Sequence, residues 1–244
     1  MKKFLVLVAA VCMAYTTAFA QTVKPFKEGD RAVFLGNSIT DGGRYHSFIW
    51  LYYMTRFPNM PIRIFNGGIG GDTAYDMNKR LDGDIFSKNP TVLMVTFGMN
   101  DSGYYEYNGD NAKEFGEQKY QESIKNFQQM EKRFKELPHT RIVMTGTSPY
   151  DETAQIKDNT VFKKKNETIK RIIEYQRESA ARNGWEFTDW NAPMVAINQE
   201  LQQKDPSFTL CGNDRIHPDN DGHMVMAYLF LKAQGFACLL YTSP

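Results

Sequence analysis

The residue best placed to act as a nucleophile is Ser38. An apolar run at residues 32–35 stops at Gly36, and Ser38 follows two residues later. A short buried strand that ends in a glycine-led turn holds a hydroxyl group at the rim of a sheet, where ligands of α/β proteins collect. The same residue types are also common at ordinary helix caps. Ser38 by itself therefore leaves both interpretations open.

A second segment near the other end of the chain offers a base for such a serine. Asp214 precedes His217 by three residues, and Pro218 stiffens the exit from the segment. An Asp at this spacing can accept a hydrogen bond from Nδ1 within a tight turn, which leaves Nε2 free to accept a proton. The alternative is a surface histidine near a helix start. The other histidines lack an Asp at this spacing: His46, His139 and His223.

Two further loops offer hydrogen-bond donors for an oxyanion. Residues 66–73 contain four glycines, which places backbone N–H groups where a ligand can approach them closely. Residues 97–101 contain the carboxamide of Asn100. The glycines do not have the spacing of a dinucleotide-binding loop, and no P-loop is present. A flexible turn before a helix that begins near Asp72 and Thr73 remains the alternative for the first loop.

Alternating strand and helix patterns predict how these loops are arranged. We expect strands at residues 32–35, 62–66, 91–96, 141–145 and 185–188, and helices at residues 45–57, 120–137, 169–183 and 221–232. The first helix is apolar nearly all round, which predicts a buried helix. Such alternation predicts one α/β domain with a parallel sheet covered on both faces. The loops after the first three strands must then emerge at one rim.

Taken together, the four segments resemble those of the SGNH, or GDSL-type, hydrolase family. They occur in the family's order: Gly36 to Thr40, the loop that ends at Gly71 to Thr73, Gly98 to Asp101, and Asp214 to Pro218. Asn37 stands where the family usually has Asp. The resemblance implies a flavodoxin-like three-layer α/β/α sandwich with a five-stranded parallel sheet.

The resemblance also implies roles for individual residues. Ser38 would be the nucleophile, His217 the base and Asp214 its orienting carboxylate. The oxyanion would be met by the backbone N–H groups of Ser38 and Gly71 and by the amide of Asn100. No cofactor is implied, and the sequence has no His-Glu-x-x-His motif or clustered Cys and His that would indicate a metal site.

The chain ends carry separate predictions. Residues 1–20 have a basic start, an apolar stretch too short to span a membrane and small residues before a cleavage site between Ala20 and Gln21. We therefore expect a signal peptide, export to the periplasm or the extracellular space, and a catalytic domain at residues 21–237. Residues 238–244 show no closing pattern, and we expect them to be a non-native tail. Cleavage would leave Cys211 and Cys238, enough for one disulfide.

Charge and aromatic residues bear on the substrate. Loss of Lys2 and Lys3 changes the formal charge from +1 to −1, and the chain has no basic block that would indicate nucleic-acid binding. Tyr104, Tyr105 and Tyr107 follow the Asn100 loop and are candidates for a platform on which a sugar stacks. We expect an esterase that removes acyl groups, above all acetyl, from a glycan or small-molecule ester. The alternatives are a lipase or lysophospholipase, and a non-catalytic glycan-binding protein of the same fold.

Overall fold

A single parallel sheet organises the computed structural model, which describes residues 22–157 and 160–236. The five strands are β1 (Arg31–Gly36), β2 (Arg63–Gly68), β3 (Val92–Val95), β4 (Arg141–Gly146) and β5 (Glu186–Asp189). They pair in the order β2-β1-β3-β4-β5, and every pair is parallel. This is the flavodoxin-like order, so the predicted sheet is confirmed.

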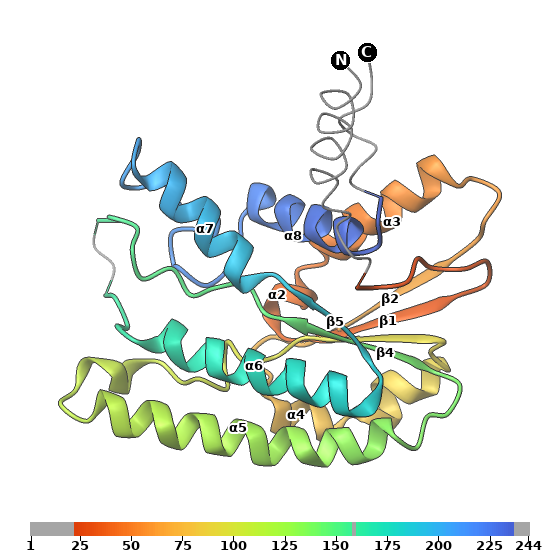
Figure 1. Ribbon diagram of the computed structural model, residues 1–244, viewed down its shortest axis with the longest axis horizontal. Helices are drawn as coiled ribbons and strands as arrows, with labels where there is room; N and C mark the ends of the chain where they lie inside the picture. The colour runs from red at the N-terminus through yellow and green to blue at the C-terminus, as the bar shows by residue number, and fades with distance from the viewer. Residues whose placement is uncertain (1–21, 158–159, 237–244) are drawn as a thin grey trace, which may run out of the picture.

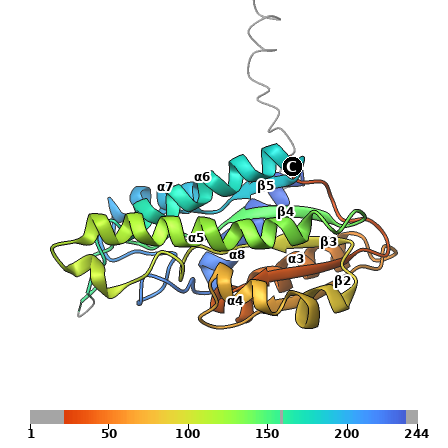
Figure 2. The ribbon, with the colours of Figure 1, turned by 90° about the horizontal axis from the view of Figure 1, so that it is seen from below.

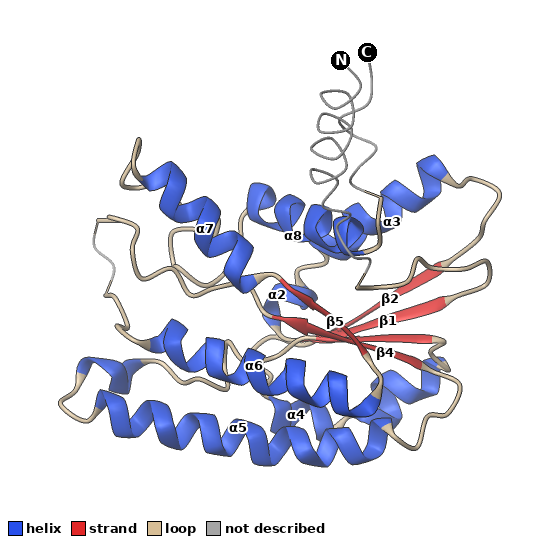
Figure 3. Cartoon of the chain, in the orientation of Figure 1, coloured by secondary structure: helices blue, strands red, loops and turns tan. Residues whose placement is uncertain are grey.

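Helices cover both faces of the sheet (Figures 1 and 3). One face carries α3 (Arg44–Arg56), α7 (Asn191–Gln202) and α8 (Asn220–Ala233), and the other carries α4 (Ala74–Lys79), α5 (Ala112–Phe134) and α6 (Lys165–Asn183). Figure 2 shows α5 and α6 running side by side. Two separate apolar clusters fill the spaces between the sheet and these layers. The predicted three-layer sandwich is therefore present.

The burial of each strand explains why the central strands of the sheet could be predicted from the sequence. In the central strands β1, β3 and β4, every residue beyond the first of β1 and β4 is buried. Strands covered on both faces give continuous apolar runs. The outer strands β2 and β5 are only partly buried. Their alternating and polar residues follow from their position at the sheet edges.

The prediction that the first helix is buried all round is wrong. One face of α3 packs inward through Tyr45, Ile49 and Tyr53, but Trp50 and Leu51 on its other side are exposed. Leu51, together with Phe48 and Tyr52 of α3 and residues of α8, lines an open apolar groove of about 500 Å³. An apolar pattern that runs round a helix therefore does not distinguish burial from an exposed apolar face.

Other differences from the predicted elements concern helix starts and short helices. Helix α5 begins at Ala112, eight residues before the predicted start, and α7 was not predicted at all. Three short segments continue the chain between the main elements: η1 (Leu81–Ile85), η2 (Phe86–Lys88) and η3 (Tyr105–Asn108). The glycine-rich loop does lead into a helix, because Thr73 and Asp76 form a capping box at the start of α4.

The predictions about the chain ends lie outside the described residues. These are the signal peptide at residues 1–20, the non-native tail at residues 238–244, and a disulfide through Cys238. Cys211 is buried and free, and its thiol donates to the carbonyl of Pro149. Among the helices of the described residues, none combines the length and apolarity needed to cross a bilayer.

Candidate active site

Ser38, His217 and Asp214 form a continuous hydrogen-bonded chain. The Oγ atom of Ser38 lies 2.8 Å from Nε2 of His217, across 179 positions of sequence. On the other side of the imidazole, Nδ1 lies 2.6 Å from Oδ2 of Asp214. The expected meeting of the hydroxyl and the imidazole is therefore present. A hydroxyl, an imidazole and a carboxylate in this order are the arrangement in which a base can take the hydroxyl proton.

The end of β1 and the following helix hold Ser38 at the rim of the sheet. Ser38 is the first residue of the short helix α2 (Ser38–Asp41), and the side chain of Asn37 accepts a hydrogen bond from the N–H of Ile39 at 3.1 Å. Asn37 thus fills the N-cap role that an Asp would also fill. Gly36 is required because an added Cβ would lie 2.0 Å from Oγ1 of Thr40. The turn is therefore tightly packed beneath the serine.

The turn that carries the histidine is held by its own carboxylate and by a buried arginine. Oδ1 of Asp214 accepts the backbone N–H groups of Ile216 and His217, both at 2.9 Å. Arg215 adopts a left-handed conformation with φ +67 and is 2% exposed. Its guanidinium donates to the carbonyls of Asp151 and Ala154 at 3.0 and 2.8 Å. The side chain between Asp214 and His217 thus anchors the turn to the loop after β4.

The carboxylate and the imidazole shift each other's pKa in opposite directions. The hydrogen bond to Asp214 raises the pKa of His217 above its ordinary value, although partial burial opposes this change. Partial burial acts to raise the pKa of Asp214, but hydrogen bonds from His217 and Ile216 outweigh it and lower this pKa. Asp214 therefore stays ionised, and His217 becomes a stronger base.

Strand order places donor groups on both sides of Ser38. Because β1 lies between β2 and β3, the loop of Ser38 is flanked by the glycine-rich loop and by the Asn100 loop. A Cβ added to Gly70 would lie 4.0 Å from Cβ of Ser38. Gly71 has a φ of +84, which favours glycine. Neither Ser38 N–H nor Gly71 N–H donates to another described residue, so both remain available for an oxyanion.

The amide of Asn100 is oriented by two neighbours. Its Nδ2 donates to the carbonyl of Asp72 at 2.9 Å, and its Oδ1 accepts the hydroxyl of Tyr104 at 2.5 Å. The loop itself is held by the buried carboxylate of Asp101, which accepts the N–H groups of Ala74 and Gly98 at 2.9 Å. Since an amide nitrogen has two hydrogens, one remains for a ligand.

Arg80 joins the serine loop to the glycine-rich loop. It was not identified as a site residue from the sequence. Its Nε donates to Oδ2 of Asp72 at 2.6 Å, and its Nη2 donates to the carbonyls of Gly36 and Gly67 at 3.2 and 2.8 Å. Arg80 and Asp72 are both largely buried. One side chain thus fixes the ends of β1 and β2 relative to each other. Arg80 is separated from the glycine loop by α4, and no local pattern marks it.

The three candidate platform tyrosines have different environments. The hydroxyl of Tyr104 donates a hydrogen bond to Oδ1 of Asn100. Tyr105 is 79% exposed, with its ring edge-on to Phe162 at 5.4 Å between centroids. Tyr107 differs from the expectation because it is buried, and its hydroxyl donates to the Ser102 carbonyl at 2.8 Å. A buried ring cannot present its face to a sugar, so Tyr107 is part of the core and only Tyr105 faces the solvent.

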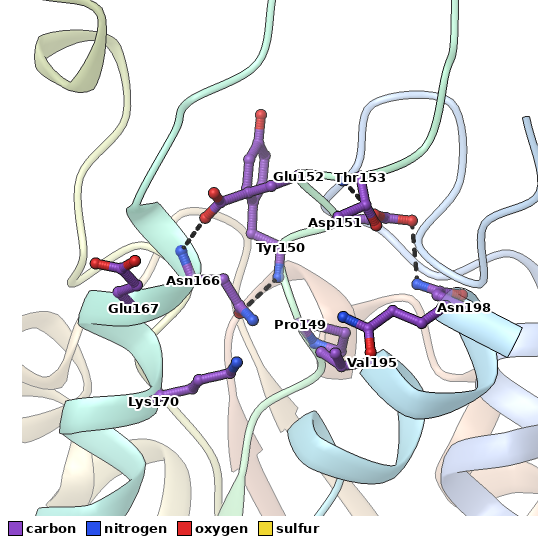
Figure 4. Close-up of a pocket in the computed structure, with 11 residues that line it drawn as sticks. Pro149, Tyr150, Asp151, Glu152, Thr153, Asn166, Glu167, Lys170, Val195 and Asn198 are labelled. Atoms are coloured by element: carbon purple, nitrogen blue, oxygen red, sulfur yellow. Dashed lines mark hydrogen bonds between the residues drawn. The ribbon is translucent and has the colours of Figure 1, made fainter. Parts of the chain in front are cut away.

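A separate pocket of about 180 Å³ lies beside the loop after β4 (Figure 4). In Figure 4 the Tyr150–Thr153 segment crosses above it, with Asn166 and Lys170 of α6 on one side and Asn198 of α7 on the other. Nδ2 of Asn198 donates to Asp151 at 3.1 Å. The pocket contains none of Ser38, Asp214 and His217. Its walls brace the segment to which Arg215 is anchored.

Comparisons with known proteins identify relatives of this chain. A sequence model of the GDSL-like lipase/acylhydrolase family matches residues 34–225. The chain is 24% identical over 224 residues to an acetylxylan esterase from Geobacillus stearothermophilus, and the match covers 85% of this chain and 95% of that protein.

Solved structures share the fold at similar identity. A catalytic mutant of Axe2, an acetylxylan esterase from Geobacillus stearothermophilus, aligns with a TM-score of 0.68 and 22% identity, over 86% of this chain and 96% of that one. LAE5, an alpha/beta hydrolase enzyme from the metagenome of Lake Arreo, aligns with a TM-score of 0.63 and 22% identity, over 87% and 98% of the two chains.

Proposed function

The chain belongs to the GDSL-like lipase/acylhydrolase family, and from this premise we propose that it is a serine esterase that removes acetyl groups from carbohydrate. The observation that carries the proposal is the hydrogen-bonded chain from Ser38 through His217 to Asp214, at 2.8 and 2.6 Å.

The reaction begins with attack of Ser38 Oγ on the ester carbonyl carbon. Nε2 of His217 takes the hydroxyl proton as the new C–O bond forms, and the carbonyl oxygen becomes an oxyanion. The N–H groups of Ser38 and Gly71 and the free hydrogen of Asn100 Nδ2 stabilise that charge. Collapse of this intermediate breaks the bond between the acyl carbon and the sugar oxygen. His217 gives the proton to that oxygen, and the acyl group stays on Ser38.

Water completes the cycle through the same groups. His217 takes a proton from the water as it attacks the acyl carbonyl, and the oxyanion forms again in the same place. Collapse of this second intermediate breaks the bond to Ser38 Oγ, and His217 returns the proton to the serine. Asp214 holds the imidazole and offsets its positive charge at both proton transfers.

Three observations support an acetylated glycan as the substrate. The relative from Geobacillus stearothermophilus carries the name acetylxylan esterase. Tyr105 follows the Asn100 loop and exposes 79% of its surface, so its ring is accessible to a sugar. His217 and Asp214 have side chains that are about half exposed, which suits a bulky polar acceptor.

Release of acetate from acetylated xylo-oligosaccharides tests the proposal, with 4-nitrophenyl octanoate as the competing substrate. We expect the wild-type protein to deacetylate the oligosaccharides and to hydrolyse the octanoyl ester poorly, and Ser38→Ala to do neither. Preference for the octanoyl ester would indicate a lipase. Glycan binding without turnover of either ester would indicate a non-catalytic binding protein.

A further inference from the structure

Asn100 makes a pair of hydrogen bonds that together select one orientation of its amide. The carbonyl of Asp72 can only accept, so the group that faces it at 2.9 Å must be Nδ2. Oδ1 then faces the hydroxyl of Tyr104 at 2.5 Å and accepts a hydrogen bond from it. A flipped amide would place two oxygen atoms against each other at Asp72. The remaining Nδ2 hydrogen is therefore fixed in direction.

The hydroxyl of Tyr104 is suited to remain a donor. Burial raises the pKa of Tyr104 well above its ordinary value, and the nearby carboxylates of Asp101 and Asp214 act in the same direction. The phenol therefore keeps its proton throughout the pH range in which an esterase works. Its hydrogen bond goes to the side-chain oxygen of Asn100, so Tyr104 contacts the amide and not the oxyanion.

A buried lysine fixes the ring and the loop beneath it. Nζ of Lys165 lies 3.8 Å from the ring centroid of Tyr104. It donates to the Met99 carbonyl and to Oγ of Ser102, both at 2.6 Å, and also to the carbonyl of Gly103. All three acceptors belong to the loop that carries Asn100.

Burying the ammonium group of Lys165 is energetically unfavourable. Lys165 is 0% exposed, and none of the ion pairs between described residues includes it. Burial lowers the pKa of Lys165 to about 7, against the opposing effect of Asp101 and Glu152. Perturbed buried groups of this kind concentrate around functional sites. Here the three hydrogen bonds from Nζ of Lys165 support the loop on both sides of Asn100.

We propose that Tyr104 is a positioning residue that acts through Asn100. Its hydroxyl holds the amide so that one Nδ2 hydrogen points at the oxyanion, and Lys165 holds the tyrosine ring under that amide. This proposal rests on the proposed function, because it assigns Tyr104 a role only if Asn100 stabilises an oxyanion. It replaces the expectation that Tyr104 is a sugar platform.

A double-mutant cycle tests the proposal with 4-nitrophenyl acetate, a substrate that has no sugar. The proteins are wild type, Tyr104→Phe, Asn100→Ala and the double variant. We expect Asn100→Ala to lower kcat by about 10²–10³. Tyr104→Phe removes one hydrogen bond and should lower kcat by about 10-fold with KM nearly unchanged. In the double variant the loss should equal that of Asn100→Ala alone, because Tyr104 then has nothing to orient.

Any other result of the double-mutant cycle contradicts one step of the proposal. If Tyr104→Phe costs the same factor with and without Asn100, or costs nothing, Tyr104 does not act through the amide. If Asn100→Ala retains wild-type kcat, the oxyanion role in the proposed function is wrong. Tyr175→Phe is the matched control, since that hydroxyl also makes one hydrogen bond, to Gln128 at 3.0 Å on the outer helices. We expect it to leave kcat unchanged.

Discussion

Nδ1 of His217 lies 2.6 Å from Oδ2 of Asp214, while the other oxygen of the same carboxylate accepts two backbone N–H groups of the turn. The carboxylate therefore fixes both the imidazole and the backbone that carries it. This double use explains how two residues so close in sequence form a rigid pair, even though both side chains are about half exposed.

The dependence of kcat/KM on pH should show the effect of Asp214 on His217 directly. Asp214 raises the pKa of His217 above its ordinary value of 6.5, and only the neutral imidazole can accept the serine proton. We therefore expect kcat/KM to fall as the pH drops through a midpoint above 6.5. In Asp214→Asn the stabilising charge is gone, so the midpoint should move to lower pH and kcat should fall by about 10³–10⁴. A midpoint that stays in place in Asp214→Asn would contradict this assignment.

Arg80→Met tests whether Arg80 positions the two loops for catalysis as well as stabilising the fold. The change leaves the largely buried carboxylate of Asp72 unpaired and should destabilise the fold by about 3 kcal/mol. It also removes the donors to Gly36 and Gly67, so kcat should fall. Adding Asp72→Asn removes the unpaired charge and should restore part of the stability but not kcat. Urea unfolding and steady-state kinetics measure both. Full recovery of kcat in the double variant would mean that Arg80 acts only through Asp72.

Tyr105→Ala tests the sugar platform. We expect a rise of about 5-fold in KM for acetylated xylo-oligosaccharides, because an exposed aromatic face is lost, and no change with 4-nitrophenyl acetate. Trp50→Ala removes another solvent-exposed aromatic ring, which lies on α3 and is 44% exposed, and should change neither KM. Equal effects of Tyr105→Ala on both substrates would exclude a sugar-specific role.

Acid stability should depend on His223. Burial lowers the pKa of His223 to about 4, so between pH 6.5 and pH 4 the unfolded chain binds a proton that the folded chain does not. The folded state should lose up to about 3 kcal/mol across this range as the pH falls. The raised pKa of His217 opposes this trend, because it favours the folded state at low pH.

His223→Phe isolates the contribution of His223. Nδ1 of His223 has no hydrogen-bond partner among the described residues, and its ring stacks on Tyr45 at 6.0 Å, which a phenyl ring can preserve. We expect the variant to lose less stability than wild type between pH 7 and pH 4.5, measured by urea unfolding at each pH. An equal loss in both proteins would assign the acid sensitivity to other groups.

The residues of the hydrogen-bonded chain from Ser38 through His217 to Asp214 were predictable because each lies in a short local pattern. Ser38 follows a strand, so parallel topology brings its loop to the rim that the glycine-rich loop and the Asn100 loop share. Asp214 and His217 share one turn between α7 and α8, and the family resemblance assigned that turn to the same site. Arg80 and Lys165 were not predictable. Each donates to backbone carbonyls of another loop. Every residue type has a backbone carbonyl, so the sequence does not show which residues accept these hydrogen bonds.

The fold was predictable where burial is continuous and less so elsewhere. The central strands are buried on both faces and gave clear apolar runs. The helix α3 was misjudged because an apolar circumference does not reveal that Trp50 and Leu51 face outward. Tyr107 was misjudged because three neighbouring tyrosines have the same residue type, and only tertiary packing buries one of them.

Covalent labelling of Ser38 tests the central claim most directly. A nitrophenyl phosphonate should react with the wild-type protein in a ratio of about one to one, and peptide mass mapping should place the adduct on Ser38. Ser38→Ala should take up none, and His217→Ala should react much more slowly, since no base lies within hydrogen-bond reach of the hydroxyl. An adduct on another residue, or labelling of Ser38→Ala at the wild-type rate, would contradict the account.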